Sequence, residues 1–166
     1  FIFQSDAFTS YILDASAMVL FPLILVENFL MNIWEEIGWR GYALPRLQTR
    51  LSMLVSSLIV GAFHALWHWP HFLVRDSVMA INYHNSFLWF LVWMLFISVI
   101  YSWVYNSTNG SLLSVSLFHS SLNAVNVLLF PNLGIAFSVF PFYLLVTAVF
   151  SLGVIFYSKK SVKVVS

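Results

Sequence analysis

The chain has 166 residues, of which 61% are hydrophobic, 19% aromatic and only 8% charged, and its mean hydropathy is +0.90. Because a soluble domain carries about 25% charged residues, this composition all but excludes a soluble globular fold, and it argues equally against disorder. A net charge of +1 provides no electrostatic basis for binding nucleic acid. The absence of cysteine excludes disulfides, thiolate catalysis and zinc–thiolate sites. We therefore expect an integral membrane protein rich in helices.

Five stretches are apolar and long enough for spanning helices, each of which needs about 20 mostly apolar residues. They cover about 11–43, 51–73, 87–105, 111–130 and 138–157. Pro45, Pro70 and the polar runs 106–110 and 131–134 separate them. We predict an all-α, polytopic transmembrane bundle with about five spanning helices and a polar intramembrane cavity, forming a single domain over 1–166. Because the chain begins at Phe1 rather than Met, we expect further helices upstream of it.

Basic residues indicate the orientation of the bundle. They cluster between the first and second stretches and again after the fifth: Arg40, Arg46, Arg50, Lys159, Lys160 and Lys163. Positive loops stay in the cytoplasm, and four spans between the two clusters place both on the same side. This pattern predicts a cytoplasmic C-terminus.

The first stretch carries ionisable residues at depths where lipid is expected, and such residues usually mark function. Glu36 and Arg40 are four residues apart, share a helix face and are expected to pair. Glu35 lies about 100° around the helix, where it can face a cavity and act as a general base on water. Asn28 and Asn32 extend a polar stripe toward Glu35. The alternative is a cluster at the membrane interface that only sets topology.

Histidines occur in the second and fourth stretches. His64 and His68 are four residues apart and can share a metal, although hydrogen-bonded structural histidines are commoner. His119 and Asn123 share a helix face and can ligate a metal or hold an oxyanion; the alternative is hydrogen bonding between helices. Together with the glutamates, these residues could supply a base, metal ligands and oxyanion donors to one site.

In this order the three patterns resemble the motifs of the CPBP family, the CAAX-protease and bacteriocin-processing family of intramembrane proteases. The resemblance covers about 20–157. The family motif EExxxR matches 35–40, within a flanking WRGYALPRLQ of bacterial type, and HxxxN matches 119–123. The motif FxxxH matches at His68 within a WHWP run, while His64 stands at the position of the Phe.

The resemblance implies an endopeptidase that cleaves a membrane-associated peptide or protein with activated water and without a covalent intermediate. It implies that Glu35 activates the water and that His68 assists it. His119 and Asn123 would stabilise the oxyanion, and Glu36 and Arg40 would be supporting residues. The family is described as metalloproteases, so a divalent metal, zinc first, is expected at Glu35, His68 and His119. The bacterial flank implies the bacterial plasma membrane.

Two other functions stay open. The first is a non-catalytic bacteriocin self-immunity or peptide-binding membrane protein, in which the motif residues serve binding or packing. The second is a proton or metal-ion transporter, which the lack of an evident inverted repeat disfavours. The protease interpretation also has a geometric requirement. His68 lies about 25 Å along its helix from Leu51, so it meets Glu35 only if that helix tilts or starts lower, or if the first helix continues to Leu44.

Overall fold

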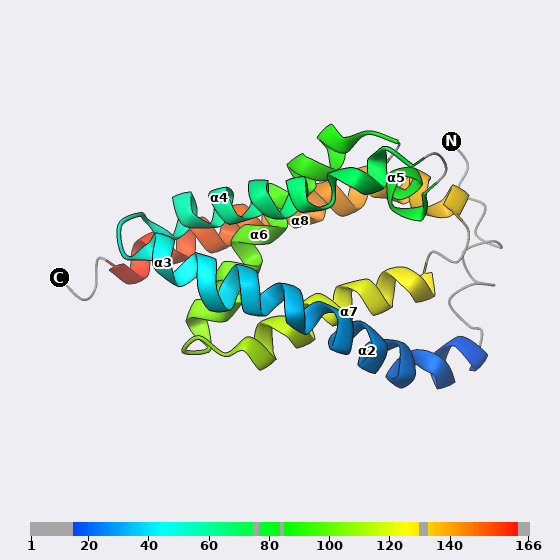
Figure 1. The fold of residues 1–166 in the computed structure, drawn as a ribbon, viewed down its shortest axis with the longest axis horizontal. Helices are drawn as coiled ribbons and strands as arrows, with labels where there is room; N and C mark the ends of the chain where they lie inside the picture. The colour runs from blue at the N-terminus through cyan, green and yellow to red at the C-terminus, as the bar shows by residue number, and fades with distance from the viewer. Residues whose placement is uncertain (1–14, 75–76, 84, 130–132, 163–166) are drawn as a thin grey trace.

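The computed structural model describes residues 15–74, 77–83, 85–129 and 133–162, and within these ranges the regular elements are all helices, joined by short turns, with no strand (Figure 1). The helices are α2 (Ala15–Glu36), the π-helix η1 (Ile37–Ala43), α3 (Leu44–Gln48), α4 (Met53–Trp67), the 3₁₀ helix η2 (Trp69–Phe72), α5 (Val78–Asn82), α6 (Phe87–Ser107), α7 (Leu112–Leu129) and α8 (Leu133–Val162). Each of the five predicted stretches therefore contains one long helix.

The first predicted helix does continue past Leu44, as the convergence of the site residues requires. α2 runs directly into η1 and then into α3, which ends at Gln48. Pro45 does not interrupt this path, because it lies in the first turn of α3, where its missing N–H is tolerated. The chain then turns back into α4, so that Glu35 on the outgoing arm and His68 on the returning arm reach the same depth.

The second predicted helix, over 51–73, is wrong at its C-terminal end. α4 ends at Trp67, and His68 caps it with its backbone N–H on the carbonyls of Ala65 and Leu66. The cause is Pro70, which disfavours α-helical geometry at the residue before it and opens the 3₁₀ turn η2. Consequently α4 has only 15 residues.

Among the described residues, two helices are long and apolar enough to cross a membrane: Phe87–Ser107 and, within α8, Phe140–Ser158. The shorter apolar helix Met53–Trp67 falls below that length. The all-α class is thus confirmed, and two of the five expected helices have the length and composition of a membrane span.

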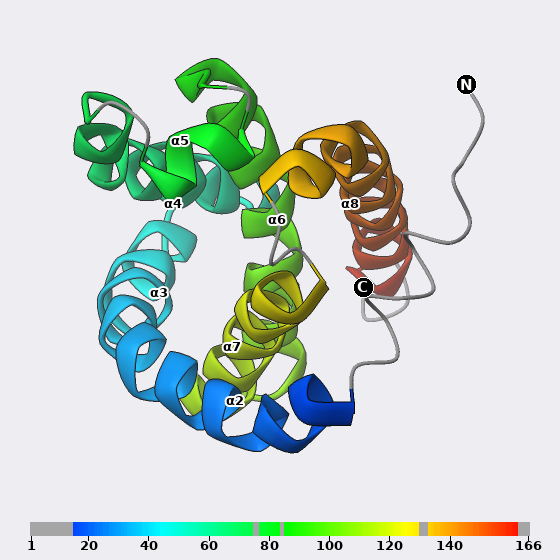
Figure 2. The same cartoon turned by 90° about the vertical axis from the view of Figure 1, so that its right-hand side faces the viewer.

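The helices pack around α6. Figure 2 shows α4, α7 and α8 on different sides of α6, and each of them contacts it, while α2 packs along α7. Large apolar side chains point outward from α2 and α8, among them Leu23, Trp34, Phe142 and Phe156, each at least 66% exposed. The interior holds an apolar cluster around α6 that includes Phe90, Trp93 and Ile97. Beside it lie buried polar side chains: Asn32, Glu36, Arg40, Ser56, Ser57, His64, Ser98, Ser102, Ser116, His119 and Ser120. Apolar side chains on the outer surface, with the ionisable side chains facing the interior of the bundle, are typical of a protein in lipid.

Small residues bring α4 and α6 close together. A Cβ added to Gly61 would lie 2.8 Å from the Cβ of Ser98 and 3.1 Å from the carbonyl oxygen of Met94. Ser98 itself donates a hydrogen bond from Oγ to the carbonyl of Ser57 across this interface, at 2.9 Å. Close approach at small residues is typical of helix pairs in membranes.

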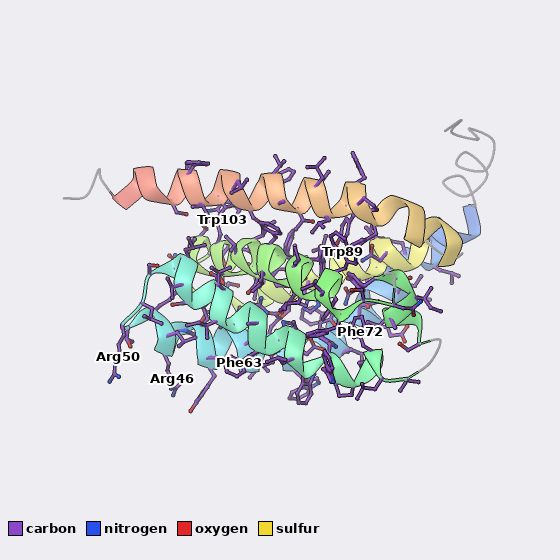
Figure 3. All side chains as sticks on the ribbon, turned by 90° about the horizontal axis from the view of Figure 1, so that it is seen from above. Arg46, Arg50, Phe63, Phe72, Trp89 and Trp103 are labelled. Atoms are coloured by element: carbon purple, nitrogen blue, oxygen red, sulfur yellow. The ribbon has the colours of Figure 1, made fainter. Side chains whose placement is uncertain are left out.

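Both basic regions lie at one end of the molecule. The turn between α3 and α4 and the C-terminal end of α8 share that end (Figure 1), and the side chains of Arg46 and Arg50 project outward from the turn (Figure 3). A pocket of about 500 Å³ opens there, lined by Arg46, Leu47, Thr49, Arg50 and Leu51. It does not include the ionisable residues of the interior.

Candidate active site

The predicted ion pair between Glu36 and Arg40 is present at the centre of the bundle. Arg40 Nη1 lies 3.2 Å from Glu36 Oε1, and both side chains are fully buried. Arg40 Nη2 donates to Ser98 Oγ at 3.2 Å, and the guanidinium lies over the ring of Tyr101, 4.6 Å from its centroid. Two residues of α6 thus hold the arginine that neutralises Glu36.

The π-helix η1 carries Arg40 to this position. The wider turn of a π-helix changes which side chains point inward, and such turns are frequent at functional sites. Within η1, Arg40 is fully buried whereas Ile37 is 42% exposed. Gly41 lets η1 lie against the start of α7, since a Cβ there would come within 3.3 Å of Leu112. Two glycines in the segment, Gly38 and Gly41, are consistent with an irregular turn.

Glu35 faces the other way, toward two histidines at the end of α4. Its Oε2 lies 3.0 Å from His64 Nε2 and 4.0 Å from His68 Nε2. The Glu35 side chain is 27% exposed and that of His68 16%, whereas that of His64 is 1% exposed. Glu35 and His68 therefore border the open side of the cluster, and His64 forms its inner wall.

The imidazole of His64 is enclosed by aromatic rings and by Arg40. Its ring stacks between Trp39 and His68, at centroid distances of 5.1 and 5.3 Å, and its Nδ1 lies 3.3 Å from Arg40 Nη1. Phe63, one residue earlier, points to the outer face of α4 and is 60% exposed. It therefore cannot supply the packing of the motif's Phe, and His64 fills that place.

The third predicted pair lies on α7. His119 Nδ1 is 2.9 Å from Glu36 Oε1. Because this carboxylate is paired with Arg40 and accepts hydrogen bonds, Nδ1 is the donor and Nε2 of the neutral ring keeps a lone pair. Asn123 Nδ2 donates to Asn32 Oδ1 at 3.4 Å, which joins it to the polar stripe on α2. Both residues thus contact α2 from one face of α7, and the sequence predicted that they share a face.

Three side chains of types that bind zinc, one carboxylate and two imidazoles, meet at Glu35, His64 and His68. One ligand atom from each lies within 4.8 Å of the others, and within the described ranges this is the group with metal-binding spacing. It contains the predicted pair of histidines one turn apart on α4. It differs from the predicted set of Glu35, His68 and His119 at one position, because His119 approaches from α7 and hydrogen-bonds Glu36 instead.

Ser98, Tyr101 and Trp39 belong to the site and were not singled out from the sequence. Ser98 and Tyr101 lie in the most uniformly apolar stretch, where a serine or tyrosine is an ordinary packing residue. Their spacing was the available signal: three residues apart, they share one face of α6 with each other. Only the fold shows that this face meets Arg40.

Fold and site together define an α-helical membrane protein with a carboxylate–imidazole centre in its interior. Residues 17–125 match the family described as type II CAAX prenyl endopeptidase, Rce1-like. The chain is 34% identical to CAAX prenyl protease 2 of Methanococcus maripaludis over 109 residues, which are 63% of this chain and 38% of that protein. It is 26% identical to lysostaphin resistance protein A of Staphylococcus haemolyticus over 132 residues, 78% of this chain and 34% of that protein.

The chain belongs to the Rce1-like CAAX prenyl endopeptidase family of intramembrane proteases, which confirms the resemblance to the CPBP family. It spans little more than a third of the length of these curated relatives.

Proposed function

We propose that this chain carries the catalytic centre of an intramembrane endopeptidase that hydrolyses a peptide bond with water activated by Glu35. The observation that carries the proposal is the position of the Glu35 carboxylate. It lies 3.0 Å from His64 Nε2 and 4.0 Å from His68 Nε2 on the open side of the cluster, while the adjacent Glu36 is neutralised by a buried arginine. One carboxylate is thus left with access to a water molecule.

The reaction follows from these positions. Glu35 takes a proton from water as the water oxygen adds to the substrate carbonyl carbon, and His68, with Nε2 4.0 Å from Glu35 Oε2, helps to hold that water. The carbon–nitrogen bond then breaks, and Glu35 returns the proton to the leaving nitrogen. The products are a free carboxyl group and an amine, and no bond forms between enzyme and substrate.

His119 and Asn123 would stabilise the oxyanion of the tetrahedral intermediate. The Asn123 amide has two hydrogens, and only one is directed to Asn32. Because Nδ1 of His119 already donates to Glu36, His119 offers Nε2–H to an oxyanion only as an imidazolium.

A divalent metal, zinc first, is part of the proposal. Glu35 and His68, which border the open side of the group with metal-binding spacing, would hold the ion, and carboxylate and imidazole are both zinc ligands. Bound there, the ion would polarise the scissile carbonyl and acidify water.

The proposed substrate is a membrane-associated peptide or protein, and the proposed location is the bacterial plasma membrane with a cytoplasmic C-terminus. The shared end of the α3–α4 turn and of α8 supports this orientation. The name of one relative, a lysostaphin resistance protein, favours testing a second candidate function. This is a non-catalytic self-immunity or peptide-binding protein.

Replacing Glu35 with Gln separates the two functions. The amide keeps the size of the side chain but cannot accept a proton, so cleavage should fall about 10²–10⁴-fold, the usual contribution of a general base. Cleavage of prenylated CAAX peptides and of unprenylated membrane peptides is measured by mass spectrometry with the full-length protein in lipid vesicles. Glu27→Gln is the matched control, since Glu27 lies on the same helix but is exposed. If cleavage persists in Glu35→Gln, the protease mechanism is wrong.

A further inference from the structure

We propose that His64 is a positioning residue that donates a hydrogen bond to Glu35, and that it does not act as a metal ligand. This inference rests on the proposed function, because Glu35 is the base that His64 would orient. It departs from the family motif, which places a Phe where His64 stands and therefore assigns this position no polar role.

The placement of the protons on His64 follows from its two neighbours. Nδ1 lies 3.3 Å from Arg40 Nη1. A guanidinium only donates hydrogen bonds, so Nδ1 must accept and must carry a lone pair. A neutral imidazole then carries its hydrogen on Nε2, which lies 3.0 Å from Glu35 Oε2. His64 thus accepts from Arg40 on one side and donates to Glu35 on the other.

This proton placement conflicts with a metal at the same nitrogen. A metal bound to Nε2 needs the lone pair there, and the hydrogen of a neutral ring would move to Nδ1. Two N–H groups, those of His64 and Arg40, would then face each other at 3.3 Å in a fully buried position. Arg40 cannot relax to avoid this, because Nη1 is held by Glu36 and Nη2 by Ser98. The spacing of Glu35, His64 and His68 suits a metal, but the hydrogen bonds of His64 do not.

The hydrogen bond from His64 fixes the orientation of the Glu35 carboxylate. A donor 1% exposed and packed between Trp39 and His68 has little freedom to move, so the carboxylate that it holds is oriented as well. Orientation of a reacting group matters steeply, since a displacement of about 1 Å can cost about 10²-fold in rate. His64 therefore acts on kcat through Glu35, without touching the substrate.

The proton placement is tested by solid-state NMR on the full-length protein, labelled with ¹⁵N-histidine, in lipid vesicles. The His64 signals are identified as those missing from His64→Phe or, if that variant fails to fold, from His64→Gln. We expect a protonated Nε2 and an unprotonated Nδ1, unchanged when zinc chloride replaces a chelator. A hydrogen on Nδ1, or loss of the Nε2 hydrogen when zinc is added, would overturn the proposal whether or not the protein is a protease.

Two substitutions then test the positioning role. His64→Phe keeps the aromatic ring but removes both hydrogen bonds, whereas the amide of His64→Gln can place an N–H near the position of Nε2. We expect His64→Phe to lower kcat at least 30-fold with KM within about threefold, and His64→Gln to recover most of that loss. His71→Phe, an exposed histidine, is the control.

Equal activity of His64→Phe and the wild type would overturn the proposal, as would a folded His64→Gln that is no better than His64→Phe. If Glu35→Gln cleaves as fast as the wild type, the proposed function is rejected. The protonation of His64 measured by NMR is independent of that outcome.

Discussion

Arg40 is the residue on which the interior of the site depends. Its guanidinium contacts Glu36, His64, Ser98 and the ring of Tyr101, so it joins the π-helix to α4 and α6. A charge so deeply buried is tolerated only because its partners are arranged around it. The same contacts separate the two glutamates, since Glu36 is neutralised and Glu35 is not.

Arg40→Ala should harm stability as much as activity. Removing one partner of a buried ion pair leaves an uncompensated charge, at a cost of about 3–5 kcal/mol. The double variant Arg40→Ala, Glu36→Gln removes that charge and should recover part of the loss. Thermal unfolding in detergent measures both, with the exposed Arg46→Ala as the control. If the double variant is no better folded than Arg40→Ala, neutralising Glu36 is not the role of Arg40.

Pairs within a helix were predictable from the sequence, and contacts between helices were not. Glu36 with Arg40 and His64 with His68 follow from a spacing of four residues, and both pairs are present. Whether His64 or His119 lies at Glu35 depends on how α4 and α7 are rotated about their axes. No spacing within one helix contains that information.

The helices show the same difference between local features, which the sequence predicts, and features that depend on contacts between helices, which it does not. Five apolar stretches predicted five long helices, because apolar length is the main requirement of a membrane. The π-turn at Ile37–Ala43 could not be predicted, because two glycines in a segment do not distinguish it from an α-helix, and the buried contacts that Arg40 makes with Glu36 and Ser98 appear only in the fold. The end of α4 at Trp67 lies three residues before Pro70, where a proline predicts a boundary without fixing it to one residue.

The α4–α6 interface should not tolerate a side chain at Gly61. In Gly61→Ala the new methyl group would lie 2.8 Å from Ser98 Cβ, so the helices must separate, at a cost of about 1–3 kcal/mol. The separation also moves Ser98 away from Arg40, and activity should fall further than stability alone explains. Thermal unfolding and cleavage rates are compared with Gly153→Ala on α8, where a Cβ meets nothing within 4 Å. Equal melting temperatures for the two variants would show that the interface adapts.

The whole molecule has two ends of different character, and their sides of the membrane can be measured. The chain has no cysteine, so Thr49→Cys at the α3–α4 turn and Leu73→Cys after η2 each add a single thiol to it. Both positions are exposed. We expect a membrane-impermeant thiol reagent to label Leu73→Cys from outside intact cells, and Thr49→Cys only in inverted vesicles. The opposite pattern would reverse the predicted orientation.

The shortness of α4 has a consequence for the bilayer around it. Fifteen residues span about 22 Å, whereas the hydrocarbon layer is about 30 Å thick. This hydrophobic mismatch is relieved by local thinning of the lipid, which would bring water and headgroups down to the end of α4, where His68 and Glu35 lie. Cleavage should therefore be faster in short-chain than in long-chain phosphatidylcholine vesicles, and a rate independent of acyl length would show that water reaches the carboxylate by another path.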